Sequence, residues 1–270
     1  MTRLARLRPV STRRVAASVT GLALLALSGC GSAAGQSADT LTDVNLVSNE
    51  ALTVCTDMPY APFEFRKNGK PTGFDIELVQ QVADSLQVKL EVIDVSFDDI
   101  TSGTSLNTDE CDVAISAMTI TGERARVIDF SSPYFDAKQA LVTPRGSGLD
   151  ELEELGGQRV GVQAETTGET FLSDFAPETT KVVTYADAAL LEEAIVSGEV
   201  DAAIYDNTVS GQVTSTNTDL KVAREFDTGE QYGMAVTKDG NVPLLRQING
   251  SLAELRDSGV YDKIFTKYFG

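Results

Sequence analysis

Hydrophobic and polar positions alternate with two different periods along the chain after residue 45. Short runs rich in β-branched and apolar residues predict strands, and runs with apolar residues three and four positions apart predict amphipathic helices. In the first part of the chain, the runs 51–57, 88–95 and 111–118 predict strands. The run 73–86 predicts a helix with Asp75 as its N-cap, because an acidic side chain there can accept from free backbone N–H groups.

This first series continues with a short helix over 97–107 and a turn leading into a short helix over 119–130. A second series then begins. Its predicted strands are 139–144, 158–163, 180–185, 201–206, 220–226 and 232–238. Its predicted helices are 148–157, 166–176, 187–200, 242–259 and 260–270.

Alternation of strands and helices predicts an α/β fold with mostly parallel sheets flanked by helices on both faces. Two such series predict two lobes, and no Pro- or Gly-rich linker separates them, so we expect strands to join them. The natural place for a ligand is the crevice between the lobes, at the carboxyl ends of the strands.

Composition narrows the functional classes. The 270 residues carry a formal net charge of −18, which repels phosphate backbones and excludes nucleic acid as a partner. The chain has no His, which removes Ser-His-Asp hydrolysis and imidazole metal sites, and three Cys are too few for a zinc cluster. We therefore expect neither a metal nor a cofactor.

Residues 1–29 have the features of an export signal. Five Arg and no acid precede an apolar run over 15–27, which is shorter than the roughly 20 residues that span a bilayer. The end, Leu27-Ser28-Gly29-Cys30, resembles the lipobox of bacterial lipoproteins, in which the Cys is lipidated and the chain is cut before it. An ordinary signal peptide with a chance Cys30 is the alternative. The small and polar segment 30–45 is predicted to be a flexible tether to the membrane.

The two remaining cysteines, Cys55 and Cys111, lie in or beside predicted strands. In an exported and oxidising setting a disulfide between them is plausible if those strands are neighbours, and two buried free thiols are the alternative.

Seven blocks in register carry a family resemblance: TDMPYAPFEF, GFDIEL, CDVAISAMTITGERARVIDFSSPYF, VGVQAETTGETF, DAAIYD, QYGMAVTK and KIFTKYFG. They resemble the polar-amino-acid class of bacterial extracellular solute-binding proteins, such as the glutamine-, histidine- and lysine/arginine/ornithine-binding proteins. The resemblance implies a two-lobed periplasmic-binding-protein-like clamp joined by two hinge strands. Lobe 1 would comprise 46–134 plus 234–270, and lobe 2 would comprise 138–230.

The resemblance also implies a function. We expect a monomeric lipoprotein on the outer face of the cell membrane that captures a free polar or basic amino acid and delivers it to an ABC transporter permease, without catalysis. A free amino acid carries opposite charges on one carbon, and both must be compensated when they leave water. Arg124 matches the family residue that holds the α-carboxylate, and Asp206 matches the acid that receives the α-ammonium. From the residues alone, two alternatives remain open: Arg124 could lie on the surface, and Asp206 could cap a helix.

Other residues match family positions around the ligand. Thr166 and Thr167 open a helix whose free N–H groups suit a carboxylate, although Thr166 with Glu169 also fits a structural capping box. On the opposite lip the matches are Ser116, Ala117 and Thr119.

Tyr60 and Phe97 match aromatic walls, with core packing as the alternative for each, whereas we assign Phe63 and Phe65 to packing. Asp57 and Gln163 match positions that recognise the ligand side chain. Glu165 departs from the Gly that many relatives have there; it would favour Arg or Lys as the ligand only if it points inward.

Two other functions remain open. One is an exported enzyme on the same scaffold, similar to cyclohexadienyl dehydratase, in which a carboxyl of raised pKa would replace the missing His as general acid. The other is a ligand-sensing subunit of a signalling system, which would need a separate partner protein.

Overall fold

The computed structural model describes residues 44–270. The predicted leader 1–29, the lipidation site Cys30 and all of the tether 30–45 except its last two residues lie outside the described part. Within residues 44–270, every helix falls short of the length and apolarity needed to cross a membrane.

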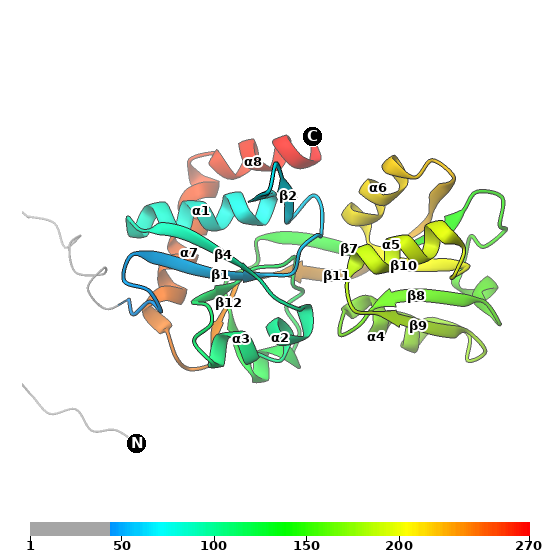
Figure 1. The fold of residues 1–270 in the computed structure, drawn as a ribbon, viewed down its shortest axis with the longest axis horizontal. Helices are drawn as coiled ribbons and strands as arrows, with labels where there is room; N and C mark the ends of the chain where they lie inside the picture. The colour runs from blue at the N-terminus through cyan, green and yellow to red at the C-terminus, as the bar shows by residue number, and fades with distance from the viewer. Residues whose placement is uncertain (1–43) are drawn as a thin grey trace, which may run out of the picture. The chain divides into compact units, whose positions relative to one another are not determined.

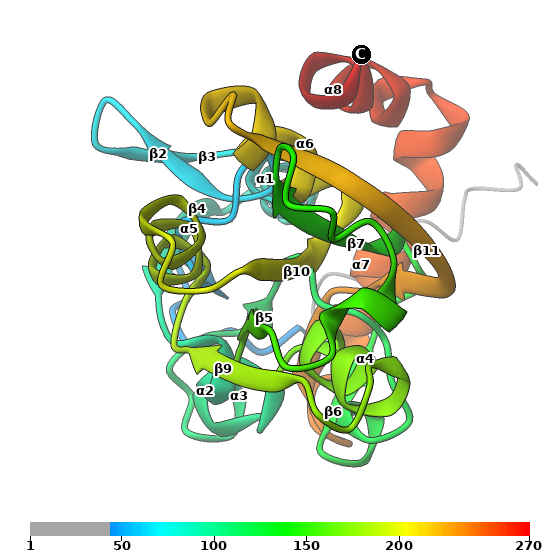
Figure 2. The same ribbon diagram turned by 90° about the vertical axis from the view of Figure 1, so that its right-hand side faces the viewer.

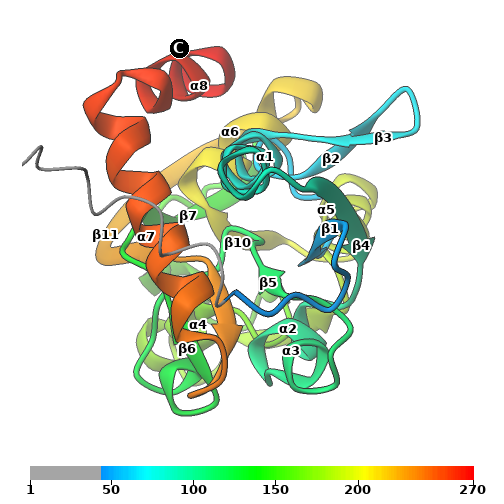
Figure 3. The ribbon, with the colours of Figure 1, turned by 90° about the vertical axis from the view of Figure 1, so that its left-hand side faces the viewer.

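The first lobe is built on a five-stranded sheet in the order β4-β1-β5-β12-β6 (Figure 3). Its strands are β1 (Ala51–Thr56), β4 (Lys89–Asp94), β5 (Val113–Ala114), β6 (Ile128–Phe130) and β12 (Ala235–Thr237). The strand β1 is buried along its whole length because it lies between β4 and β5, both of which are parallel to it. The strand β12 returns from the end of the chain and pairs antiparallel with β5 and β6.

Helices cover both faces of this sheet. On one side, α1 packs against two C-terminal helices, and on the other side lie two short helices (Figures 1 and 3). The elements are α1 (Phe74–Leu86), α2 (Phe97–Thr101), α3 (Thr104–Asn107), α7 (Val242–Asp257), α8 (Val260–Phe269), the 3-10 turn η1 (Arg124–Arg126) and the hairpin of β2 (Phe65–Lys67) and β3 (Lys70–Thr72).

The second lobe is built on a five-stranded sheet in the order β11-β7-β10-β8-β9 (Figure 2). Its strands are β7 (Phe135–Pro144), β8 (Arg159–Gln163), β9 (Lys181–Tyr185), β10 (Ala202–Asp206) and β11 (Leu220–Tyr232). Its helices are α4 (Thr167–Phe175), α5 (Ala188–Ser197), α6 (Asn207–Thr216) and the 3-10 turn η2 (Leu152–Leu155). Each of α4 and α5 packs against the parallel strands β8, β9 and β10.

The chain crosses between the two sheets twice, at 131–134 before β7 and at 233–234 after β11. The strands β7 and β11 pair antiparallel from Phe135 with Tyr232 to Pro144 with Leu220, and together they form the connection seen between the lobes in Figure 1. Each sheet is mostly parallel, as predicted, with one reversed strand: β12 is antiparallel to β5 and β6 in the first sheet, and β7 is antiparallel to β10 and β11 in the second. The exact lobe boundaries stay a prediction.

Several local predictions need correction. The strand expected over 111–118 covers only Val113 and Ala114, and Ala117, with a φ of 44°, is not extended. The helix expected over 97–107 divides into α2 and α3 at Gly103, whose φ is 76°. Residues 128–130 form a strand instead of a helix.

Asp75 is not the N-cap of α1. The cap is Gly73, with a φ of 133°, where a Cβ atom would lie 1.9 Å from the carbonyl oxygen of Phe63. Only glycine fits such a close approach of two backbones. Asp75 lies in the first turn, fully buried, and accepts from the backbone N–H of Ala117 and the hydroxyl of Tyr134.

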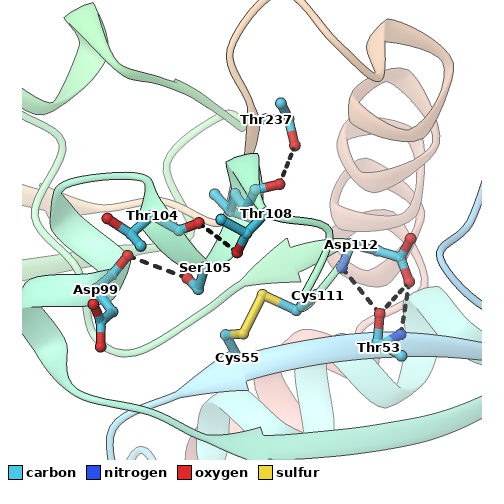
Figure 4. Close-up of a disulfide and its surroundings, with 10 residues drawn as sticks. Thr53, Cys55, Asp99, Thr104, Ser105, Thr108, Cys111, Asp112 and Thr237 are labelled. Atoms are coloured by element: carbon cyan, nitrogen blue, oxygen red, sulfur yellow. Dashed lines mark hydrogen bonds between the residues drawn. A yellow bond between two sulfur atoms is a disulfide. The ribbon is translucent and has the colours of Figure 1, made fainter.

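A disulfide joins Cys55 in β1 to Cys111 just before β5, with the two Cα atoms 5.7 Å apart (Figure 4). The two strands are neighbours, as the disulfide requires. Beside it, the Asp112 carboxylate accepts from the backbone N–H and the hydroxyl of Thr53, so the start of β5 is held to β1 by both a covalent bond and hydrogen bonds (Figure 4).

Candidate functional site

A cavity between the two lobes is lined by every residue that the sequence predicted to contact a ligand. It encloses about 500 Å³ of space between atoms, including the part open to solvent. The predicted residues in its wall are Asp57, Tyr60, Phe97, Ser116, Ala117, Thr119, Arg124, Gln163, Thr166, Thr167 and Asp206. Their contact with a ligand stays a prediction.

Arg124 is buried in the wall of the first lobe, with 7% of its surface exposed. It begins η1, directly after the polar turn that follows β5. Its guanidinium donates to the carbonyl oxygen of Thr119 at 2.8 Å and to that of Glu165 in the second lobe at 2.8 Å. It also lies 5.2 Å from the ring centre of Phe97. The predicted alternative of a surface Arg is wrong, since the guanidinium is held on several sides.

Burial lowers the pKa of Arg124 to about 10, and the nearby acids, Asp206 first and then Glu230, oppose that shift. The group therefore stays a cation at neutral pH. Among the described residues that line the cavity, it is the only Lys or Arg side chain. It is therefore the natural partner for an anionic group of the ligand.

Asp206 ends β10 in the second lobe and is 9% exposed. It occupies the N-cap position of α6, but its side chain makes no capping hydrogen bond. Instead it accepts from the hydroxyl of Tyr60 at 2.9 Å, from the hydroxyl of Tyr232 and from the side-chain amide of Gln139 at 2.8 Å. The predicted alternative of a capping role is therefore wrong.

Burial raises the pKa of the Asp206 carboxyl to about 6, and the Glu230 carboxylate adds to the rise. The three donors oppose it, so the group is mostly ionised at neutral pH. A buried carboxylate of raised pKa gains from any cation that enters the cavity. Arg124 and Asp206 thus present opposite charges from opposite lobes.

The N-terminus of α4 opens at the cavity beside these charges. Thr166 caps it by accepting from the backbone N–H of Glu169 at 3.2 Å. The predicted capping box is only half formed, because the Glu169 carboxylate accepts from the backbone N–H of Glu165 instead of that of Thr166. Thr167 is the first helical residue, and its hydroxyl lies 3.4 Å from that of Thr119 across the cleft.

Two aromatic rings bound the cavity on the first lobe. Tyr60 and Phe97 both line it, and Phe97 also contributes to the core below α2. Phe63 is fully buried and packs against Phe74, Phe135 and neighbouring rings, as the packing role predicts.

Asp57 and Gln163 meet across the cleft, where the Gln163 amide donates to the Asp57 carboxylate at 2.8 Å. Burial raises the pKa of Asp57 to about 6; the hydrogen bond from Gln163 opposes the rise, and the charges of Asp187 and Asp94 add to it. This end of the cavity is therefore negative and is suited to a cation or an amide N–H group of a ligand.

Glu165 does not line the inner cavity. Its side chain is exposed and lies in the wider outer groove. Its φ of 60° explains why glycine suits this position, since glycine adopts positive φ without steric cost.

A buried polar layer supports the lip formed by Ser116 and Ala117. The Ser116 hydroxyl donates to the Glu64 carboxyl at 2.7 Å and accepts from the backbone N–H of Asp57 at 3.1 Å. Burial raises the pKa of Glu64 well above its usual range, and burial raises that of the neighbouring Asp75 to about 7. The layer fixes the lip from behind the cavity wall.

The geometry can be compared with known proteins. Residues 52–270 match the model of the bacterial extracellular solute-binding proteins, family 3. The chain belongs to this family. A probable histidine-binding protein of Neisseria gonorrhoeae is 30% identical over 262 residues, which cover 94% of this chain and 94% of the relative.

Among the solved structures similar to this solute-binding protein are two of amino-acid-binding proteins. An ancestral arginine-binding protein bound to arginine is 40% identical, with a TM-score of 0.77 over 82% of this chain and 98% of that one. The ancestral amino acid-binding protein AncCDT-1, a precursor of cyclohexadienyl dehydratase, is 34% identical, with a TM-score of 0.73 over 82% and 95%. The predicted two-lobed α/β clamp is confirmed.

Several polar residues at the site of this solute-binding protein were not predicted from its sequence, and three of them contact predicted residues. Gln139 in β7 is fully buried and lines the cavity, and Tyr232 at the end of β11 holds Asp206. Glu230 in β11 accepts from the hydroxyls of Thr119 and Thr167. The position of Gln139 at the start of an apolar run was the one signal that the sequence offered, and no feature of the sequence pointed to Glu230.

Among residues 44–270, no group of three or more metal-ligating side chains is suitably placed for an ion.

Proposed function

We propose that this protein captures a free polar or basic amino acid between its lobes and delivers it to the permease of an ABC importer. The observation that carries the proposal is the pair Arg124 and Asp206, which face one cavity from opposite lobes. An α-carboxylate on the guanidinium and an α-ammonium on the carboxylate compensate both poles of a zwitterion. The relatives named for histidine and arginine support the ligand class.

Charge supports a basic amino acid within that class. The cavity wall holds two carboxyls, Asp206 and Asp57, against one cation, Arg124. A ligand with two positive groups and one carboxylate matches this set, whereas a glutamate or aspartate would place a second carboxylate beside Asp57. We therefore propose arginine or lysine ahead of glutamine.

Closure follows from the same geometry. Polar contacts already cross from lobe to lobe: Asp57 with Gln163, Tyr60 with Asp206, and Arg124 with the carbonyl of Glu165. A ligand that engages residues of both lobes stabilises the arrangement in which they are close together. Binding and closure are then one event that a permease can recognise.

A thermal-shift screen against the twenty amino acids and ornithine tests the proposal. A ligand that binds only the folded state raises the melting temperature by mass action. We expect the largest shift with arginine or lysine, and we expect Arg124→Ala to abolish it. The absence of any shift in the unchanged protein would contradict the proposed function.

Attachment to the membrane is part of the proposal. A lipid on Cys30 would supply two acyl chains, enough for stable anchoring on the outer face. Mass spectrometry of the membrane-associated protein should show an N-terminal peptide that begins at Cys30 and carries the added mass of the lipid; an unmodified Cys30 would contradict the anchor. We propose a monomer, which light scattering would test.

A dehydratase-like enzyme is the second candidate, favoured by the likeness to the precursor AncCDT-1 and by Asp57, whose raised pKa would suit a general acid. Incubation with prephenate-like acids, followed by product analysis, separates the two. Turnover that Asp57→Asn abolishes would support the enzyme, and intact substrate would support capture alone.

A further inference from the structure

Glu230 lies near the end of β11, just after the pairing with β7 loses its register between Phe226 and Glu230. The irregularity brings its side chain to the cleft. There one carboxylate oxygen, Oε2, accepts from the hydroxyl of Thr119 at 2.8 Å and from that of Thr167 at 2.7 Å. Thr119 follows β5 in the first lobe and Thr167 begins α4 in the second. One oxygen therefore bridges the two lobes.

The other oxygen is also satisfied by neutral donors. Oε1 accepts from the hydroxyl of Thr228 at 2.8 Å and from the side-chain amide of Gln139 at 3.1 Å. The same amide donates to Asp206 at 2.8 Å. The guanidinium of Arg124 donates to two backbone carbonyls instead, although the Glu230 charge acts on it.

We propose that the Glu230 carboxylate is an internal occupant of the place that the ligand carboxylate takes, and that it determines which ligands bind tightly. The inference rests on the proposed function, because Thr167 begins the helix whose N-terminus is expected to meet the α-carboxylate, and the Thr119 hydroxyl lies 3.4 Å from that of Thr167. A bound amino acid must replace Glu230 as the acceptor of the hydrogen bonds from these two hydroxyls. Its carboxylate must also lie beside the negative charge of Glu230. Glu230 therefore weakens the binding of carboxylate ligands and holds the ligand-free lobes together.

Replacement by glutamine removes the charge and keeps the side-chain size. In Glu230→Gln, one of the two accepting oxygens is replaced by an NH₂ group, and the remaining amide oxygen is a poorer acceptor than a carboxylate oxygen. We expect affinity for arginine to rise about tenfold, the change that follows from removing a like charge and a charge-assisted hydrogen bond. Agmatine, which is arginine without its carboxylate, does not need these hydroxyls, so its affinity should change less than about threefold.

The matched control is Glu225→Gln, which removes the same charge from the same strand. Glu225 is exposed, and its ion pair with Lys138 spans 3.9 Å at the surface. Calorimetry with arginine and agmatine, on the unchanged protein and both variants, measures the selectivity. Circular dichroism checks that each variant folds.

A second measurement needs no ligand. Small-angle scattering of the ligand-free proteins should give a larger radius of gyration for Glu230→Gln than for the unchanged protein and Glu225→Gln, because this bridge between the lobes is weakened. Arginine affinity that stays equal or falls in Glu230→Gln, or a radius of gyration that does not change, would overturn the inference. Failure of the unchanged protein to bind any amino acid would instead refute the proposed function on which it rests.

Discussion

Replacement of Asp206 by asparagine should lower the affinity for arginine and raise the stability of the ligand-free protein. The asparagine side chain keeps the shape of the aspartate but lacks the charge that the proposal assigns to the ligand ammonium. Loss of one partner of a buried, hydrogen-bonded charge pair costs about 2–5 kcal/mol. Affinity for arginine should therefore fall roughly 30- to 5,000-fold.

The ligand-free protein should become more stable instead. Burial raises the pKa of Asp206 from 3.8 to about 6, so the ionised carboxyl destabilises the folded state by about 3 kcal/mol at pH 7.5. This penalty is complete above pH 6 and disappears as the pH falls towards 3.8, because the folded protein takes up the proton first. We expect Asp206→Asn to add about 1–3 kcal/mol to the free energy of unfolding at pH 7.5, after the weaker hydrogen bonds to Tyr60 and Tyr232 are counted, and clearly less at pH 5.

Calorimetry with arginine and urea denaturation of the ligand-free proteins at both pH values measure the two effects. Asp257→Asn, an exposed change at the end of α7, is the control for charge alone. Arginine affinity within threefold of the unchanged protein, or a loss of ligand-free stability at pH 7.5, would refute the reasoning.

Arg124→Lys keeps the cation but loses the planar guanidinium that can make two parallel hydrogen bonds, so calorimetry should show roughly 10- to 100-fold weaker binding of arginine. Arg126→Lys, on the surface, is the control and should bind arginine as the unchanged protein does. Equal affinity in Arg124→Lys would argue against a bidentate contact. Binding should weaken about tenfold from pH 7 to pH 5, because the ligand needs ionised Asp206 and its pKa is about 6, and calorimetry in two buffers at pH 6 should detect proton release. A flat pH profile would contradict this. The double change Cys55→Ser with Cys111→Ser should lower the free energy of unfolding by about 3–4 kcal/mol in urea denaturation, because the disulfide spans 56 residues, and reduction of the unchanged protein should give the same loss.

Strand and helix periods predicted most elements of the fold, because burial on one face imposes those periods. They did not predict the early end of β5, or the single reversed strand in each sheet, β12 in the first and β7 in the second, because strand direction depends on contacts distant in the sequence. The role of Asp75 was missed for a related reason. Its partners, Ala117 and Tyr134, lie far from it along the chain.

The family blocks placed the predicted ligand residues in one cavity because those blocks follow strand ends that meet between the lobes. Glu230 and Gln139 lie on the connecting strands, outside the crevice that strand ends alone would define. The outward position of the exposed Glu165 side chain, at a residue of positive φ, could not be predicted from sequence spacing. Residues on hinge strands therefore need the structure before they can be assigned to the site.

Calorimetry with arginine and two analogues, each blocked at one pole, tests the central claim most directly. Agmatine lacks the carboxylate, and Nα-acetylarginine lacks the ammonium charge. If Arg124 holds the first pole and Asp206 the second, Arg124→Ala should bind arginine no better than agmatine, and Asp206→Asn should bind arginine no better than Nα-acetylarginine. This assignment of the two poles would be contradicted if Arg124→Ala still preferred arginine to agmatine, and Asp206→Asn still preferred arginine to Nα-acetylarginine, as strongly as the unchanged protein does.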